Sequence, residues 1–100
     1  MGKLITIFWR DIPSHIIFKT KSGKFKKQMS TRFEEAIDRA AMRAGKGSSD
    51  AYMADWRREI VKIKTDDPQS IVDQEIELLE QMFSDDLLEK TVKSKGIKEE

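Results

Sequence analysis

The run LITIFW at residues 4–9 constrains the fold more than any other part of this chain. Thr6 is its only polar residue, and isoleucine, phenylalanine, tryptophan and threonine all favour strands. A strand that is apolar on both faces is typical of the interior of a sheet, where both of its faces are covered. We therefore expect residues 4–9 to form an inner strand.

Turn-forming residues follow this run and lead into further strands. In RDIPS, at residues 10–14, the Asp11 side chain can accept a hydrogen bond from the backbone ahead, and Pro13 fixes its own φ angle. Strand-like sequence resumes at residues 15–21 and returns as KFKKQM after Ser22 and Gly23, a pair that suits a two-residue hairpin turn. These features predict three consecutive strands.

The predicted hairpin has one apolar face and one basic face. With the turn at residues 22–23, Lys21 lies opposite Lys24 and Ile16 lies opposite Met29. Lysines that face each other across strands repel mildly unless water or an anionic surface surrounds them. The basic face is therefore either a solvated hairpin tip or a contact surface for an anionic partner. The apolar face carries Ile16, Phe18, Phe25 and Met29, and the basic patch consists of Lys19, Lys21, Lys24 and Lys26.

A first helix is expected from about residue 31. Thr31 and Glu34 have the spacing of a capping box, in which each side chain bonds the backbone of the other. Apolar residues at helical spacing continue from there to Gly45, which is the expected stop. A short helix at residues 50–56 and a strand at residues 58–65 follow.

The last long helix is predicted to begin at DDPQS, residues 66–70. Asp67 suits the N-cap position and Pro68 suits the first helical position. The sequence SDD at residues 84–86 resembles a second cap, so we expect the helix to end there and to restart.

The order of these elements predicts an α+β fold. We expect a two-layer sandwich with a mainly antiparallel sheet of about four strands, covered on one face by two main helices. Residues 1–92 would form a single domain, and residues 93–100 a flexible C-terminal tail. The second face of the sheet would then expose apolar surface that needs a partner, at Ile5, Ile7, Ile17 and Ile60.

Composition excludes several classes of function. The 100 residues contain no cysteine, so disulfides, thiolate chemistry and zinc–cysteine sites are excluded, and the cytoplasm is the default location. No apolar run approaches the length of a membrane span. We expect no membrane contact.

The net charge of +1 conceals a strong asymmetry. Residues 1–65 hold fifteen lysines and arginines against seven acids, whereas residues 66–89 hold nine acids and no lysine or arginine. Segments of opposite charge either pack against each other or present two oppositely charged faces to partners.

The sequence gives little support for a catalytic site or a metal site. His15 is the only histidine, and it lies near Arg10 and Asp11 in a predicted turn. A histidine acting as a base needs an orienting group and a nucleophile or substrate within reach, and this sequence supplies no complete set. We predict no catalytic residues, no metal and no cofactor. An enzyme that uses Arg10, Asp11 and His15 is the remaining alternative.

Two Trp–Arg pairs are candidates for a partner-binding surface. Tryptophan and arginine often anchor interfaces, although an arginine stacked on an indole is also a common contact within one chain. The candidate partner-binding residues are Trp9, Arg10, Asp11, His15, Trp56 and Arg57.

Three segments carry a resemblance to a known family. IFWRDIPSHII, RFEEAIDRAAMRAG and DAYMADWRR, in this order, resemble the small bacterial virulence factor domain family. A similar domain occurs in the larger conserved virulence factor C, beside an iron–sulfur-scaffold-like segment and helical repeats. The resemblance implies an interaction module, and it suggests a link to folate-dependent one-carbon metabolism, because single-domain relatives are encoded near such enzymes. It supplies no catalytic residues.

Two functions follow as hypotheses. The first is a non-catalytic protein-interaction module, either an accessory subunit of a cytoplasmic complex or a homo-oligomer. The second is a nucleic-acid-binding domain that uses the lysine-rich hairpin, with Phe8 or Trp9 stacking on a base.

Overall fold

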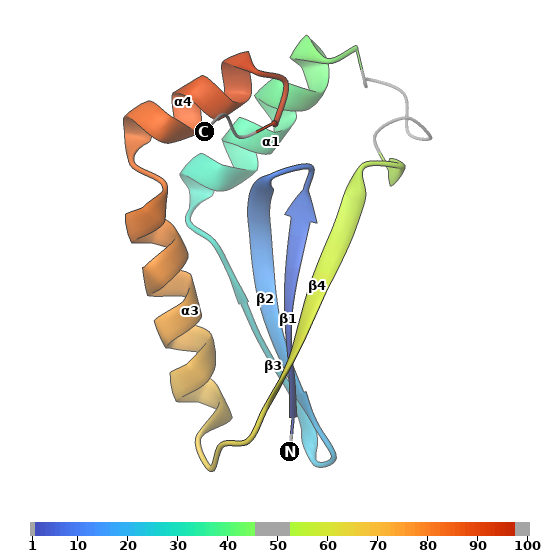
Figure 1. Cartoon of the computed structure of the whole chain (residues 1–100), viewed down its shortest axis with the longest axis vertical. Coiled ribbons are helices and arrows are strands. Elements are labelled where there is room, and N and C mark those ends of the chain that lie inside the picture. Colours follow the sequence, from blue (N-terminus) through green and yellow to red (C-terminus); the bar gives the residue numbers. More distant parts are fainter. Residues whose placement is uncertain (1, 46–52, 98–100) are drawn as a thin grey trace.

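The computed structural model describes residues 2–45 and 53–97. These residues form one antiparallel sheet with the strand order β3-β2-β1-β4, together with three helices (Figure 1). The α+β prediction is confirmed, and the apolar run lies in the inner strand β1. The elements are β1 (Gly2–Trp9), β2 (Ile12–Thr20), β3 (Gly23–Gln28), α1 (Thr31–Arg43), β4 (Trp56–Ile63), α3 (Pro68–Met82) and α4 (Asp85–Lys93).

The β2–β3 hairpin turns one residue earlier than predicted. Lys21 and Ser22 form the turn, so Thr20 lies opposite Gly23 and Phe18 lies opposite Phe25. The backbone N–H of Ser22 donates to Thr20 Oγ1 at 3.2 Å, which stabilises the turn in this position. The pairing shifts by two positions, and because side chains alternate with a period of two, the predicted faces are retained.

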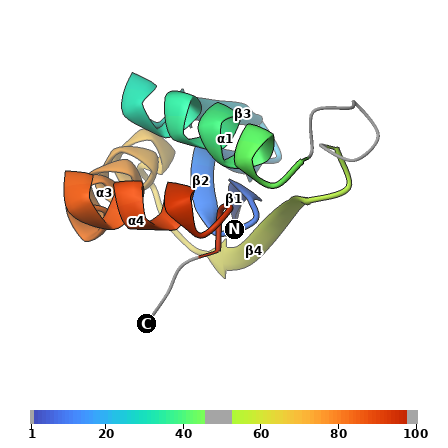
Figure 2. The same ribbon diagram turned by 90° about the horizontal axis from the view of Figure 1, so that it is seen from above.

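The helices enclose the core against one side and one end of the sheet. α3 runs beside β2 and β3, while α1 and α4 pack against each other across the end where β1 turns into β2 (Figures 1 and 2). Phe33 of α1 and Phe83 after α3 meet edge to face, with ring centroids 5.7 Å apart. The largest fully buried side chains include Trp9, Phe18, Phe33, Phe83, Ile12 and Ile16.

Helix ends agree with the predictions at three of four sites. Asp67 accepts a hydrogen bond from Ser70 N–H at 3.2 Å, and Ser84 accepts one from Leu87 N–H at 3.1 Å. Gly45 follows α1 with a φ of +73°, as a glycine stop requires. The predicted capping box is wrong, because α1 begins after Ser30, which donates to Glu80 of α3 and makes no side-chain bond to its own helix.

The acidic segment packs against the basic part of the chain. Asp73 and Glu80 of α3 form ion pairs with Lys27 of β3 and Arg32 of α1, each at 3.0 Å. Glu89 of α4 binds Arg39 of α1 through two hydrogen bonds of 2.9 Å. Part of the charge asymmetry of the sequence is thus neutralised within the molecule, on the side of the helices.

Two predicted segments fall partly outside the described residues. The short helix expected at residues 50–56 lies mainly within 46–52, which are not described, and Trp56 begins β4. Of the tail predicted at residues 93–100, residues 94–97 pack against the β1–β2 turn, where Asp11 N–H donates to the Gly96 carbonyl at 2.9 Å. Residues 98–100 are not described.

Candidate interaction surface

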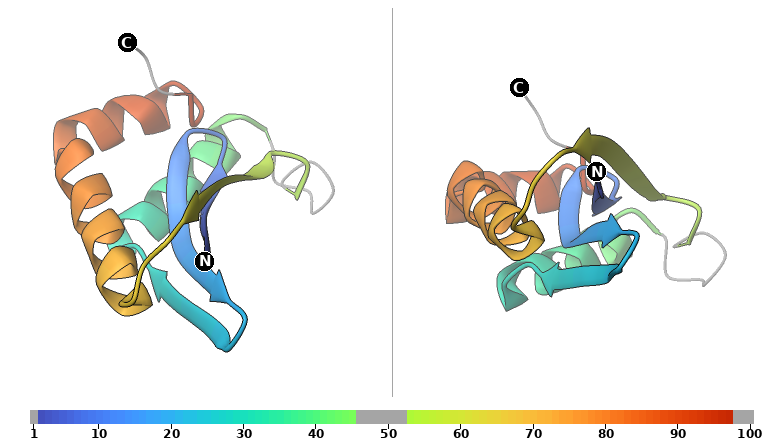
Figure 3. Two further views of the ribbon diagram at one scale, coloured as in Figure 1. Left: turned by 60° about the horizontal axis from the view of Figure 1, so that its bottom comes forward. Right: turned by 90° about the horizontal axis from the view of Figure 1, so that it is seen from below.

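In the described part of the chain, one face of the sheet has no helix over its centre, and α1 lies only at its end, where Gln28 shares a pocket with Glu34 and Asp38. Phe18 and Lys27 mark the covered face, because Phe18 is in the core and Lys27 pairs with Asp73 of α3. Side chains alternate along strands, so the neighbouring positions face the other way. We call this second surface the open face; α3 and α4 lie on the opposite side of the sheet (Figure 3).

The strand register arranges the open face in three rows that cross the strands in the order β3, β2, β1, β4. Successive rows are two residues apart along each strand, which corresponds to about 6.6 Å. The lysine row is Lys24, Lys19, Lys3 and Lys62; the isoleucine row is Lys26, Ile17, Ile5 and Ile60; the mixed row is Gln28, His15, Ile7 and Arg58.

The lysine row brings together charges from all four strands. Lys19 lies opposite both Lys24 and Lys3, and Lys3 also lies opposite Lys62. All four side chains are exposed. A shallow hollow of about 400 Å³ lies at this end of the open face, and Lys21 of the hairpin turn adds a further ammonium group to its lining. The row therefore forms one extended basic surface.

The isoleucine row gives the open face a continuous apolar strip. Ile5 is directly opposite Ile17 on one side and Ile60 on the other. Ile5 is 8% exposed and Ile17 is half-buried, whereas Ile60 on the edge strand is 51% exposed. The apolar strip borders the lysine row along its length.

His15 lies in the mixed row, beside these cations. Its Nδ1 atom is 3.1 Å from the hydroxyl of Ser14. Burial of the ring lowers the pKa of His15 below its ordinary value, and the positive charge of Lys26 lowers it further. The lowered pKa favours the uncharged imidazole, so His15 adds little positive charge to the face.

The three rows of the open face carry six cations. None of the residues in its three rows is acidic, and Lys26 and Arg58 add to the four charges of the lysine row. Cations on the side of the helices behave differently, because Lys27, Arg32 and Arg39 all pair with carboxylates. Among the described residues, these three cations on the side of the helices are thus paired with acids, whereas the rows of the open face contain cations and no acid.

The structure places the predicted partner-binding residues in several separate parts of the molecule. Trp9 is fully buried, and its ring lies under the Arg10 guanidinium, 5.2 Å from the ring centroid. Arg10 itself pairs with Asp55 at 3.3 Å and donates to the Lys95 carbonyl at 2.8 Å. These two residues hold the β1–β2 turn to its neighbours, and the indole of Trp9 has no surface for a base or a partner.

Arg57 is fixed on the covered side of the sheet. Its guanidinium lies over the Phe8 ring, 4.5 Å from the centroid, and it reaches Asp11 at 3.4 Å and Glu59 at 3.2 Å. Phe8 therefore does not lie on the lysine face, contrary to the prediction that it stacks on a base there. Arg10, Asp11 and His15 contact three different groups, an arrangement that gives no support to a shared catalytic centre.

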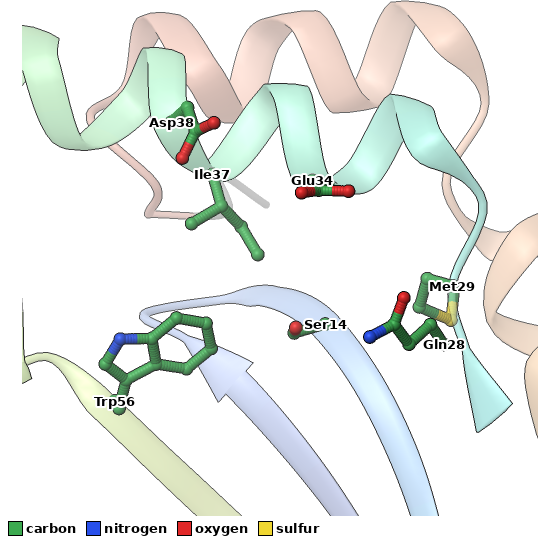
Figure 4. Close-up of a pocket in the computed structure, with 7 residues that line it drawn as sticks. All are labelled: Ser14, Gln28, Met29, Glu34, Ile37, Asp38 and Trp56. Carbon is green, nitrogen blue, oxygen red and sulfur yellow. The ribbon is translucent and has the colours of Figure 1, made fainter. Parts of the chain in front are cut away.

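Trp56 lines a small pocket between α1 and the strand ends (Figure 4). The indole forms one wall, and the carboxylates of Glu34 and Asp38 lie along the α1 side, one helical turn apart. The volume of about 200 Å³ is below the range of about 300–1,000 Å³ typical of cofactor and drug-sized sites. The other lining residues are Ser14, Gln28, Met29 and Ile37.

A larger groove runs along the covered side, where α3 does not reach β4. It has a volume of about 570 Å³, and its apolar wall includes Leu4, Val61, Ile63 and Met82. Val61 is 55% exposed and Met82 is 48% exposed. Asp11, Arg57, Glu59 and Glu75 make the rim polar and of mixed charge.

Among residues 2–45 and 53–97, no group of three or more histidine, cysteine, aspartate or glutamate side chains is placed to hold a metal ion. None of the helices in these ranges has both the length and the apolar character needed to cross a membrane.

The fold and the surface define a small α+β domain with a basic, partly apolar open sheet face. A family model described as "Virulence factor" matches residues 7–92, and the chain belongs to this family. Comparison with curated proteins and with solved structures gives no match.

Proposed function

We propose that this chain is a non-catalytic protein-interaction domain, acting as an accessory subunit or a homo-oligomer within a cytoplasmic complex, and that its partner binds the open face. The observation that carries this proposal is the isoleucine row, an apolar strip on a sheet face that no described helix covers. Exposed apolar surface of this kind, bordered by polar residues, is typical of protein contact sites.

The exposure pattern supports a partner on this face. Ile60 leaves half of its side-chain surface in water, although it lies next to the well-packed Ile5. A partner that covers Ile60 and Ile17 removes this apolar area from water, with a gain of about 25 cal/mol per Å². The surrounding lysines and Arg58 form a polar rim, which is the common anatomy of an interface.

Nucleic-acid binding is the second candidate, and the lysine row is the observation that favours it. Unpaired lysines arranged side by side attract a phosphate backbone. However, the three rows contain no phenylalanine, tyrosine or tryptophan on which a base can stack. Retention on a mixed single-stranded oligonucleotide at low salt, lost at high salt, tests this candidate.

A pair of neighbouring positions on β4 allows a controlled test of the first candidate. Ile60 faces the open side and Val61 faces the covered side, and their exposed fractions are similar, at 51% and 55%. A photo-crosslinking amino acid is introduced at position 60 in one variant and at position 61 in the other, and both are expressed in the source cells. Enzymes of folate-dependent one-carbon metabolism, suggested by the family resemblance, are candidates to look for among the products.

We expect position 60 to give a discrete crosslinked product, either with a second copy or with another protein, that position 61 does not give. The crosslinked protein is then purified, and it should form a stoichiometric complex with the wild-type chain. Equal products from both positions, or none from position 60, contradict a role for the open face.

A further inference from the structure

We infer that the element bound by the open face is an acidic amphipathic helix lying across the four strands, with its acidic edge on the lysine row and its apolar stripe on the isoleucine row. This inference rests on the proposed function and specifies the chemistry of the partner. Its basis is that the two rows run side by side in the same direction.

The first argument is charge complementarity. Lys24, Lys19 and Lys3 follow one another directly across the strands, and no acid lies in any of the three rows. Like charges in directly opposite positions destabilise a sheet, so the lysine row carries repulsion that an acidic partner removes. A partner with an acidic edge therefore gains attraction and relieves repulsion within the sheet.

The second argument is spacing. Neighbouring strands are about 4.8 Å apart, and one turn of α-helix rises about 5.4 Å. A helix that crosses the strands thus presents about one side chain per strand along each of its edges. Carboxylates one turn apart can then meet Lys19, Lys3 and Lys62 in succession. Apolar residues one turn apart, on the neighbouring stripe, meet Ile17, Ile5 and Ile60 in the same way.

The third argument concerns the backbone of the partner. An extended peptide laid on the face of a sheet finds no partner for its N–H and C=O groups, because the strands below have used theirs. A helix satisfies its own backbone and loses nothing when it is covered. A nucleic-acid strand would match the lysine row, but the isoleucine row offers its bases no aromatic ring to stack on. The combination of both rows therefore favours a helix.

The test uses a fluorescent peptide of about 15 residues, long enough to span four strands at 1.5 Å per residue. Leucines form one helical stripe and glutamates line one side of it. A control peptide has the same composition, but its leucines are spread around the helix.

Two double variants of the protein test the lysine row. Lys3→Gln with Lys19→Gln removes two charges from the lysine row, and Lys90→Gln with Lys93→Gln removes two exposed charges from α4 as the matched control. Circular dichroism first establishes that both double variants are folded.

We expect the amphipathic peptide to bind the wild-type chain more tightly than the control peptide does. The Lys3/Lys19 variant should weaken this binding at least about tenfold, while the Lys90/Lys93 variant should leave it within about twofold. Raising the ionic strength from about 0.1 M to about 1 M shortens the Debye length from about 10 Å to about 3 Å and should also weaken binding.

Three outcomes overturn the inference. Equal affinity for the two peptides shows that charge alone is recognised. Tighter binding of a single-stranded oligonucleotide, lost in the Lys3/Lys19 variant, assigns the row to nucleic acid. In the third outcome, the Lys3/Lys19 variant self-associates, or is crosslinked to a protein through position 60, as readily as the wild type. The proposed function then holds, but the partner is not an acidic helix.

Discussion

Glu80 of α3 holds Ser30, the residue that precedes α1, through both of its carboxylate oxygens. Oε2 accepts from the Ser30 backbone N–H at 2.8 Å, and Oε1 accepts from the Ser30 hydroxyl at 2.9 Å. The same carboxylate pairs with Arg32 at 3.0 Å. A helix start is normally capped by its own residues, whereas here a residue fifty positions away performs this role. The contact joins α3 to α1.

Replacement of Glu80 with Ala should therefore destabilise the whole domain. Hydrogen bonds to a charged group contribute about 1.5–3 kcal/mol each when they are well shielded, and Glu80 is one-quarter exposed, so we expect a loss of about 1–2 kcal/mol in the free energy of unfolding. Glu77→Ala on the exposed side of the same helix is the control and should change it by less than about 0.5 kcal/mol. Urea denaturation measures both, and equal values would show that the contact is not structural.

Acid should weaken the same contact. Burial acts to raise the pKa of Glu80, but the hydrogen bonds from Ser30 and Arg32 outweigh it and hold the pKa below the ordinary value of 4.5. Because the folded-state pKa is the lower one, the stabilisation is present above pH 4.5 and is lost as the pH falls through the folded-state pKa. Urea midpoints measured between pH 7 and about pH 3 should fall less steeply for Glu80→Ala than for the wild type. Identical slopes would contradict this account.

The sequence predicts those helix ends that depend on neighbouring residues. Asp67, Ser84 and Gly45 act within one helical turn, so their roles can be inferred from local spacing. The start of α1 near residue 31 is also predicted, but the group that satisfies it cannot be inferred in this way, because Glu80 reaches Ser30 from another element. Local capping signals therefore predict where a helix starts, but they predict the capping contact only where no distant side chain binds the same residue.

The open face shows that local sequence patterns also predict only part of a functional surface. Lys19, Lys24 and Lys26 were predicted to share a face from the hairpin pattern alone, and the register confirms it. Lys3 and Lys62 complete the lysine row. Lys3 joins it because β1 pairs with β2, and Lys62 joins it because β4 pairs with β1, which no local pattern specifies. Isolated lysines on separate strands give no signal until the strand order is known.

His15 offers a sensitive probe of the open face, because it is the only histidine in the chain. Burial and the charge of Lys26 lower its pKa below 6.5. Lys26→Gln should raise this pKa, since it removes a positive charge that disfavours the imidazolium. Titration of the imidazole protons by NMR measures the change directly. A wild-type pKa at or above 6.5, or no change in the variant, would contradict the arrangement of the mixed and isoleucine rows.

A side chain at position 96 should destabilise the fold, because Gly96 lies against Trp9. Its φ is +90°, and a Cβ there would approach the Trp9 ring to 2.7 Å. Gly45 is the matched control, since it has a φ of +73° and open space around the Cβ position. Gly45→Ala should cost about 1 kcal/mol from backbone strain, and Gly96→Ala about 1–3 kcal/mol more from crowding. Equal losses in urea denaturation would show that the segment moves away from Trp9 without cost.

The central claim is that the open face binds a protein partner. The most direct measurement compares the affinities of two threonine variants for the partner that is crosslinked through position 60. Ile60→Thr removes apolar area from the open face, whereas Val61→Thr alters the covered side of the same strand and preserves strand propensity in the same way. We expect Ile60→Thr to weaken the complex at least about tenfold, a loss of about 1.4 kcal/mol, and Val61→Thr to leave it within about twofold. Equal affinities for the two variants would contradict the claim.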